Sequence, residues 1–343
     1  MNKNLFLFNT SSKFGSNTYF KNIINHLPDN DYYVIYKSDK MLMGKKKNLI
    51  ISPSGLKKHI FNQVYLPILI YKLKINFIYT NSMIAIFLGG KKNILSVRNV
   101  DPFLNKFKIG FKYRIKLNLI KNLFKLSFLL AYKIVFVSNF SLSAVSKIVK
   151  VPKDKIIISY HGVDHVDKRV FHKEFDFLFV GKFIHYHNLD FVLSLLYKLE
   201  KNFNINYRIV LGDFDISLKK EITKKYQLFK NKNFLNNLNN NEVITLMKKS
   251  RILLFPSSYE ACPFTLLEAM SCSCAVIASD AGPNREILKN EGIFYNINSF
   301  EDMYKKTLEI FNNKKKAKEL GEINFFNSKQ YTWIKTRDNI IDL

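Results

Sequence analysis

Short apolar runs alternate with longer stretches of helix-like periodicity along this chain. Runs of four to six mainly apolar residues, ended by turn-forming residues, predict buried β-strands. These runs cover residues 4–9, 32–36, 48–52, 77–80, 94–97, 134–137 and 156–159, followed by 175–180, 208–211, 252–255 and 275–279. Strands that alternate with helices favour parallel sheets, so the pattern predicts an α/β fold.

A polar interruption, GVDHVDKRVFHKEF at residues 162–175, separates the two series of predicted strands. The chain has 343 residues, 47% of them hydrophobic, which is enough to bury two cores of ordinary size. We therefore predict a first domain over residues 1–165, a second over 166–326 and a terminal helix over 327–343.

The segment 251–288 combines a strand, a loop, a helix and a second strand with two glutamates. A strand at 251–255 stops at Pro-Ser-Ser, a helix is predicted at 263–272 with Pro263 in its first turn, and a strand follows at 275–279. Glu260 lies in the loop and Glu268 on the helix. Spacing alone proves little, since Glu301 and Glu309 are also eight residues apart. The strand-to-helix context distinguishes the first pair, because ligands of such sheets bind where strand carboxyl ends meet helix amino termini.

The two carboxylates suit recognition of a sugar and a diphosphate. Glu268 leans back toward Phe264 and Thr265 in the first helical turn, so both carboxylates are expected to face one pocket. N–H groups at the helix start attract anions, while carboxylates accept hydrogen bonds from sugar hydroxyls. The alternative is a surface helix with ordinary solvated glutamates.

These residues carry a family resemblance. PSSYEACPFTLLEAMSC followed by AVIASDAG resembles the E-x7-E signature of retaining glycosyltransferases of the GT-B fold, particularly glycosyltransferase family 4. Residues 177–193 and 207–213 resemble other landmarks of that family, and 96–103, 133–141 and 157–164 do so more loosely. The resemblance implies two Rossmann-like, doubly wound parallel-sheet domains that face an interdomain cleft. It also implies that the helix at 327–343 crosses back onto the first domain.

The resemblance also assigns a donor site for a nucleotide-diphosphate sugar. Lys182 and His187, which stands where lysine is usual, would hold the diphosphate, while Glu268 would bind the ribose and Glu260 the transferred sugar. Asn188 stands where glycine is common. The predicted donor-binding set is Gly15, Gly181, Lys182, His187, Glu260, Cys262, Pro263, Phe264, Thr265 and Glu268.

Three predicted catalytic residues are Glu260, Lys182 and Arg98. The family often has histidine at the position of Arg98, and this arginine would either stabilise leaving-group charge or lie exposed at a strand end. Gly15 is followed by Ser16 where the family has paired glycines, and Ser273 replaces a usual glycine after the helix. The resemblance implies front-face transfer of a hexose with retention, without a metal and without a cofactor beyond the donor substrate.

Positive charge is concentrated in the first half of the chain. Residues 1–165 hold 27 Lys or Arg against 6 Asp or Glu, which accounts for +21 of the formal +27. Residues 106–133 predict a basic helix with Tyr113, Leu117, Ile120, Phe124 and Phe128 on one face. That face would either lie on an anionic membrane surface or pack against the core beneath a solvated lysine face.

The remaining features of the sequence indicate where in the cell the protein is expected to act. No apolar run approaches the roughly 18 residues that span a bilayer, and no secretory signal is recognised, so we expect a cytoplasmic protein bound peripherally at the inner face of the plasma membrane. The three cysteines fit reduced thiols without metal spacing. The expected activity is sugar transfer to a glycan or lipid-linked acceptor in polysaccharide or lipopolysaccharide synthesis. A non-catalytic GT-B subunit and a nucleic-acid-binding protein are the alternatives; we expect no nucleic acid partner.

Overall fold

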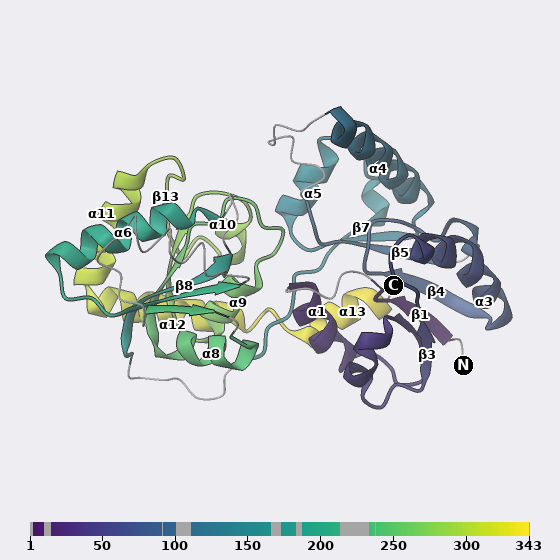
Figure 1. Cartoon of the computed structure of the whole chain (residues 1–343), viewed down its shortest axis with the longest axis horizontal. Coiled ribbons are helices and arrows are strands. Elements are labelled where there is room, and N and C mark those ends of the chain that lie inside the picture. The colour runs from purple at the N-terminus through teal and green to yellow at the C-terminus, as the bar shows by residue number, and fades with distance from the viewer. Residues whose placement is uncertain are drawn as a thin grey trace. The chain divides into compact units, whose positions relative to one another are not determined.

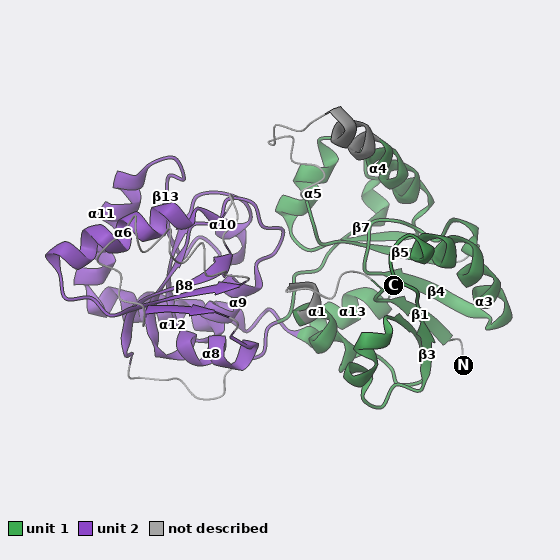
Figure 2. Cartoon of the chain, viewed as in Figure 1, with its two compact units in different colours: residues 1–162, 333–343 green, residues 163–332 purple. Residues whose placement is uncertain are grey.

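The computed structural model divides into two compact units (Figure 2). Unit 1 consists of residues 1–162 and 333–343, and unit 2 of residues 163–332. The structure describes residues 3–9, 15–90, 92–100, 111–165, 173–182, 187–212, 233–236 and 238–342, with only the backbone of 15–17 and 111–118.

Unit 1 contains a seven-stranded parallel sheet in the order β3-β2-β1-β4-β5-β6-β7 (Figure 1). The strands are β1 (Lys3–Leu7), β2 (Tyr32–Ile35), β3 (Asn48–Ile51), β4 (Ile75–Thr80), β5 (Lys92–Val97), β6 (Lys133–Phe136) and β7 (Ile156–Ile158). The helices are α1 (Gly15–Ile24), α2 (Lys57–Ile60), the π-helical η2 (Phe61–Tyr65), α3 (Leu66–Lys72), α4 (Phe111–Leu130), α5 (Asn139–Ser146) and α13 (Trp333–Ile341), with 3-10 turns η1 (Lys37–Met43), η3 (Phe87–Gly89) and η5 (Lys153–Lys155).

Unit 2 contains a six-stranded parallel sheet in the order β10-β9-β8-β11-β12-β13. The strands are β8 (Phe175–Lys182), β9 (Tyr207–Gly212), β10 (Phe234–Asn236), β11 (Ser250–Phe255), β12 (Ala275–Ser279) and β13 (Ile293–Tyr295). The helices are α6 (Leu189–Asn202), α8 (Asn240–Lys249), α9 (Phe264–Ser271), α10 (Asn284–Ile287), α11 (Phe300–Asn312) and α12 (Lys314–Ser328). One core cluster joins β8, β9, β11 and β12 to α6 and α11.

The α/β prediction is confirmed, and each of the eleven predicted strands has a counterpart within a few residues. The strands β10 and β13, which have three residues each, were not predicted from the apolar runs. The predicted terminal helix at 327–343 is wrong in its start, because α12 ends at Ser328 and α13 begins at Trp333. Between them the carbonyl of Tyr331 accepts a hydrogen bond from the N–H of Val163 at 3.0 Å, which requires non-helical backbone.

The apolar face proposed for membrane contact on α4 packs against the core over its described part. Phe124 and Phe128 are buried, and Ile120 packs beside them, in a cluster with Ile134 and Phe136 of β6. The membrane interpretation of this face is therefore wrong for these residues, and the core-facing alternative holds. Tyr113 and Leu117 lie outside the described side chains. Within the described part of the chain, no helix is long and apolar enough to span a bilayer.

Gly162 lies where the chain passes from unit 1 to unit 2, directly beside the returning segment. A Cβ at this position would come within 2.4 Å of the backbone nitrogen of Trp333. Only glycine permits two backbones to approach so closely. The two connections between the units therefore run side by side.

Candidate functional site

The carboxyl end of β8 brings Lys182 and His187 together. The backbone N–H of Lys182 donates to His187 Nδ1 at 2.8 Å. Gly181 is required for this arrangement, because a Cβ there would lie 2.9 Å from His187 Nδ1 and 2.6 Å from Phe179 Cζ. The predicted pair is thus held through the ring of His187 and the backbone of Lys182.

His187 also reaches the loop that follows β11. Its Nε2 lies 3.2 Å from Glu260 Oε1, which also accepts a weak hydrogen bond from Ser257 Oγ at 3.5 Å. Because Nδ1 accepts the Lys182 N–H, the proton of a neutral ring sits on Nε2 and is donated to the carboxylate. In this arrangement His187 links the end of β8 to the loop that carries Glu260.

Asn188 adopts a left-handed backbone conformation, with φ of 45°, immediately before α6. Glycine adopts this conformation without strain, and asparagine tolerates it better than most residues. This explains why glycine is common here in the resembling family and why asparagine can replace it. The Asn188 side chain also donates to the carbonyl of Pro256 at 2.9 Å, which ties the start of α6 to the end of β11.

The segment after β12 holds the Glu260 loop from the other side. Ser279 Oγ donates to the carbonyl of Ser257 at 2.6 Å, and Asn284 Nδ2 donates to the same carbonyl at 3.3 Å. Gly282 has φ of 57°, and a Cβ there would lie 3.4 Å from the carbonyl oxygen of Ser258. Ser279, Gly282 and Asn284 were not among the predicted site residues. Their position after a neighbouring parallel strand was the signal that could have identified them.

The helix α9 starts one residue later than predicted. Pro263 is its N-cap, with ψ of 119°, rather than its first helical residue, and no side chain caps the helix. Cys262 and Pro263 are buried, while Phe264 and Thr265 are partly exposed. An N-terminus without a side-chain cap directs its first-turn N–H groups toward the carboxyl edge of the sheet, where an anion is stabilised.

The helix α9 is followed by Ser273, the residue that stands where the resembling family usually has glycine, and Ser273 adopts a left-handed backbone conformation. Ser273 has φ of 55°, and the N–H of Cys274 donates to the carbonyl of Ala269 at 3.0 Å across it. This 6→1 hydrogen bond is the Schellman arrangement, which usually has glycine in place of Ser273. Gly321 of α12 packs on the turn, since a Cβ there would lie 2.4 Å from the Ser273 carbonyl oxygen.

Glu268 is buried on α9, which excludes the alternative of a solvated surface glutamate. Loss of solvation raises the pKa of its carboxyl to about 7; a hydrogen bond from Asn240 lowers this pKa, and the nearby charge of Asp164 raises it. Glu260 has different partners, His187 and Ser257. The two glutamates thus have different surroundings. Glu268 is buried and its pKa is raised, whereas Glu260 is partly exposed beside His187.

Arg98 belongs to an aromatic cluster at the carboxyl edge of the unit 1 sheet. Its guanidinium carbon lies 3.6 Å from the centre of the Tyr19 ring, and Nη1 donates to Asn81 Oδ1 at 2.8 Å. The Tyr19 ring also lies 5.3 Å from His161, whose pKa is lowered by burial and by the charge of Arg98. The expectation of a solvent-exposed strand-end arginine is therefore wrong. Gly15 is the first residue of α1, and residues 10–14 before it lie outside the described part.

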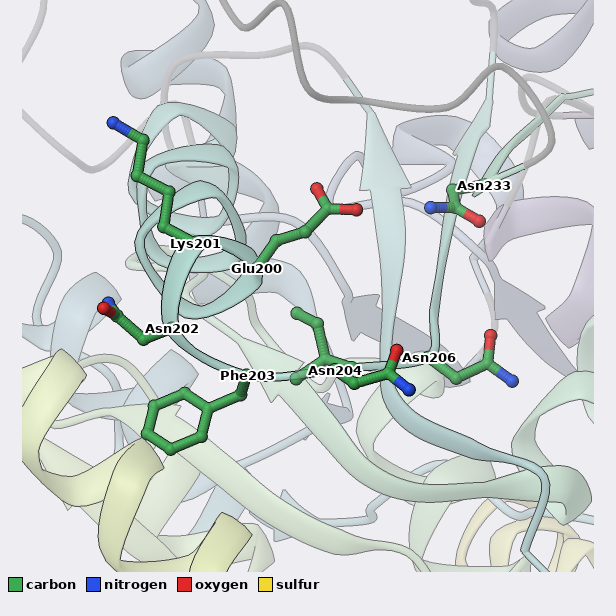
Figure 3. A pocket seen from close by; sticks show the side chains of 8 residues that line it. Glu200, Lys201, Asn202, Phe203, Asn204, Asn206 and Asn233 are labelled. Atoms are coloured by element: carbon green, nitrogen blue, oxygen red, sulfur yellow. The ribbon is translucent and has the colours of Figure 1, made fainter.

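A cavity of about 780 Å³ lies elsewhere on unit 2 (Figure 3). Its lining includes Asn206 and Asn233, which precede β9 and β10, and Glu200 near the end of α6. In Figure 3, Phe203 points away from Glu200 and Asn233. These residues lie at the amino ends of the strands, so the cavity is at the edge of the sheet opposite Lys182, His187 and Glu260.

The two parallel-sheet α/β domains have the GT-B fold of glycosyltransferases. Residues 163–325 match the family model of glycosyl transferases group 1.

Relatives agree with this assignment along the chain. An uncharacterised glycosyltransferase of Methanocaldococcus jannaschii, MJ1178, is 26% identical over 349 residues, covering 94% of this chain and 91% of that protein. The capsular polysaccharide biosynthesis glycosyltransferase CapH of Staphylococcus aureus is 32% identical over 160 residues, covering 45% of this chain and 44% of CapH. The solved structure of Anabaena HepE in complex with UDP and glucose is similar with a TM-score of 0.75 at 15% identity, covering 100% of this chain and 99% of HepE.

Proposed function

We propose that this protein is a retaining, metal-independent glycosyltransferase that moves a hexose from a nucleotide-diphosphate sugar to a hydroxyl of a glycan or lipid-linked acceptor. The observation that carries the proposal is the contact of His187 Nε2 with Glu260 Oε1 at 3.2 Å. It joins the loop after β8 to the loop before α9, the two segments from which the family resemblance draws its donor ligands. The similarity to CapH, a capsular polysaccharide biosynthesis glycosyltransferase, favours surface polysaccharide or lipopolysaccharide synthesis as the setting.

Each donor group has a matching part of the site. The ribose hydroxyls bind Glu268, and the transferred sugar binds Glu260 and the backbone of Cys262 to Thr265. The diphosphate binds Lys182 and the amino terminus of α9, where cation and helix dipole act together. The Nε2–H of His187 exchanges the Glu260 carboxylate for a phosphate oxygen when the donor binds.

The transfer proceeds from the leaving-group side of the sugar. The acceptor oxygen attacks the anomeric carbon as its bond to the diphosphate breaks, and the acceptor proton passes to a departing phosphate oxygen. Lys182 and the first turn of α9 stabilise the negative charge that develops on the diphosphate. Arg98 would also stabilise leaving-group charge, in an orientation fixed by Tyr19 and Asn81.

The proposed function also includes binding to an anionic membrane surface. The excess of 27 cations over 6 carboxylates in residues 1–165 suits an anionic lipid surface. We therefore place the protein in the cytoplasm, bound peripherally at the inner face of the plasma membrane, where a lipid-linked acceptor would be presented.

The test compares Glu260→Ala with Glu268→Ala against a panel of nucleotide sugars. Glu268→Ala should weaken binding of the free nucleotide, whereas Glu260→Ala should mainly reduce turnover, each by roughly 10- to 100-fold, or about 1.5–3 kcal/mol. Glu309→Ala is the matched control, because Glu309 lies in an exposed ion pair with Lys316 and should leave both measurements unchanged.

Two results would replace the proposal. A folded protein that binds no nucleotide sugar would be a non-catalytic subunit of this fold. Tight, salt-sensitive binding to duplex or single-stranded nucleic acid, without competition by any nucleotide sugar, would indicate a nucleic-acid-binding protein.

A further inference from the structure

An exposed apolar stripe runs along the continuous helical segment formed by α2, η2 and α3. Its members recur at intervals of three or four residues, the spacing that places side chains on one face of a helix. Six large side chains on this segment or at its start are at least half exposed: Leu56, Ile60, Val64, Tyr65, Ile68 and Tyr71. Leu56 and Tyr71, at the two ends, are 86% and 85% exposed.

The opposite face of the same helical segment packs against the unit 1 sheet. Leu66 and Ile70 are buried in a cluster with Leu7 and Ile78 of the unit 1 sheet. The exposed stripe is therefore not needed for packing within the described part of unit 1. Soluble proteins expose single apolar side chains commonly, but rows of this length indicate an interaction surface.

A second exposed row lies on α4. Leu119, Leu123, Leu126 and Leu130 are each more than 40% exposed, on a face different from that of Phe124 and Phe128. The segment 84–87 is hydrogen-bonded to both η2 and α4. Gln63 of η2 donates to the Ala85 carbonyl, and the Ala85 N–H donates to Ser127 Oγ of α4. Leu88, which follows this joining segment, is 75% exposed.

The two helical segments lie on the same face of the unit 1 sheet. The β3-to-β4 and β5-to-β6 connections both advance in the same direction along the strand order, and right-handed crossovers then place both connections on one face. The two exposed rows therefore lie on one side of the unit 1 sheet.

The charge of residues 40–100 indicates which kind of partner this surface binds. No Asp or Glu occurs between Asp39 and Asp101, whereas Lys57, Lys72 and Lys74 are exposed along or beside the stripe. Lysines combined with exposed aliphatic and tyrosine side chains match an interface between anionic headgroups and acyl chains. Nucleic acid would use the lysines but not a row of isoleucine, valine and leucine.

We infer that residues 56–71, together with Leu88 and the outer leucines of α4, form the surface through which unit 1 docks on an anionic lipid bilayer. The inference rests on the membrane partner proposed above and assigns it a surface that differs from the core-facing stripe of α4. The side chains of Ile60, Val64 and Ile68 enter the headgroup region, and the flanking lysines contact anionic headgroups.

The test is cosedimentation of the full chain with phosphatidylcholine vesicles, either alone or mixed with an equal amount of phosphatidylglycerol. The wild type should bind the mixed vesicles and not the neutral ones. Ile60→Ser combined with Ile68→Ser should reduce binding at least tenfold. The matched control is Ile323→Ser combined with Phe326→Ser, since both residues are exposed on α12 of unit 2, and it should bind as the wild type does.

Tryptophan fluorescence provides a second readout, which does not depend on measuring a reduction in vesicle binding. The one native tryptophan, Trp333, is buried, so Tyr71→Trp adds an exposed reporter, and its emission should shift to the blue with mixed vesicles. Equal vesicle binding by the Ile60 and Ile68 double variant and its control would overturn the inference. So would a wild-type dimer in solution that this double variant converts to a monomer, because a second copy of the chain would then cover the stripe.

Nucleotide-sugar binding measured on the same samples separates this inference from the proposed function. The double variant should retain wild-type donor affinity, because its changes lie in unit 1. A protein that docks on vesicles but binds no donor would retain the membrane surface and lose the proposed activity.

Discussion

His187 Nε2 lies 3.2 Å from Glu260 Oε1, while His187 Nδ1 accepts the backbone N–H of Lys182 at 2.8 Å. One imidazole thus fixes both the residue that ends β8 and the carboxylate that precedes α9. The arrangement makes the position of Glu260 depend on a side chain more than 70 residues away in the chain. A substitution at His187 therefore acts on two of the three predicted catalytic residues.

We predict that His187→Ala lowers kcat/KM for the donor by about 10- to 100-fold, because two hydrogen bonds to one ring are lost. Steady-state kinetics with a nucleotide sugar checks this. His165→Ala is the matched control, since His165 contacts the Ser328 carbonyl at 2.9 Å and neither Lys182 nor Glu260. Unchanged kinetics in folded His187→Ala would remove His187 from the site.

The buried carboxyl of Glu268 predicts a pH-dependent stability. Its pKa of about 7 in the folded protein lies above the ordinary 4.5, so the folded state holds the proton more tightly. The resulting stabilisation is present below about pH 4.5 and is lost as the pH rises toward 7. Glu268→Gln should therefore gain stability relative to the wild type between about pH 5 and pH 8, by on the order of 2–3 kcal/mol in urea unfolding. A difference that does not vary with pH would contradict the raised pKa.

The same group predicts how nucleotide affinity varies with pH. If Glu268 binds the ribose as proposed, its ionised carboxylate would accept stronger hydrogen bonds from the hydroxyls than the protonated acid, so affinity for the free nucleotide should rise as the pH passes through about 7. In Glu268→Gln this rise should be absent, and the affinity at about pH 8 should be lower by roughly tenfold. Titration calorimetry at several pH values provides the measurement.

Ser273 predicts a stabilising substitution. With φ of 55° the residue pays for a conformation that glycine adopts freely, so Ser273→Gly should raise the free energy of unfolding by about 0.5–1 kcal/mol. Ser273→Ala is the control, because it removes the hydroxyl and keeps the Cβ. Denaturant unfolding in which the alanine variant gains as much as the glycine variant would show that backbone strain is not the cause.

Gly321 predicts the opposite effect in the neighbouring helix. Alanine normally stabilises a helix interior by up to about 1 kcal/mol relative to glycine. Here its Cβ would lie 2.4 Å from the Ser273 carbonyl oxygen, so Gly321→Ala should instead destabilise by about 1–3 kcal/mol. Thermal unfolding distinguishes the two signs.

The apolar pattern of the sequence was sufficient to predict eleven strands, because each is a short, mainly apolar run ended by turn-forming residues. It missed β13, since Ile293–Tyr295 is too short for periodicity to register. It left open whether Phe124 and Phe128 of α4 face the core or a membrane, because they form one helical row and Leu119 and Leu123 another, and spacing does not reveal which row meets β6.

The site was predictable in composition but not in its internal contacts. Asn188 and Ser273 were recognised only as replacements of glycine, and their positive φ angles show why glycine is usual at both positions. The pKa of Glu268 depends in part on residues brought by other elements, Asn240 from α8 and Asp164 from the start of unit 2. Sequence spacing carries no information about such contacts.

Trp333 lies late in the chain, yet its ring packs 5.9 Å from that of Tyr19, near the start. The ribosome therefore releases Tyr19, Arg98 and His161 long before the residue that completes their surroundings. Residues 163–332 emerge in between and form a unit of their own. A nascent chain halted just short of Trp333 would carry all of unit 2, while the aromatic cluster around Arg98 would still lack one wall. The aromatic cluster around Arg98 is thus completed only after all of unit 2 has been synthesised.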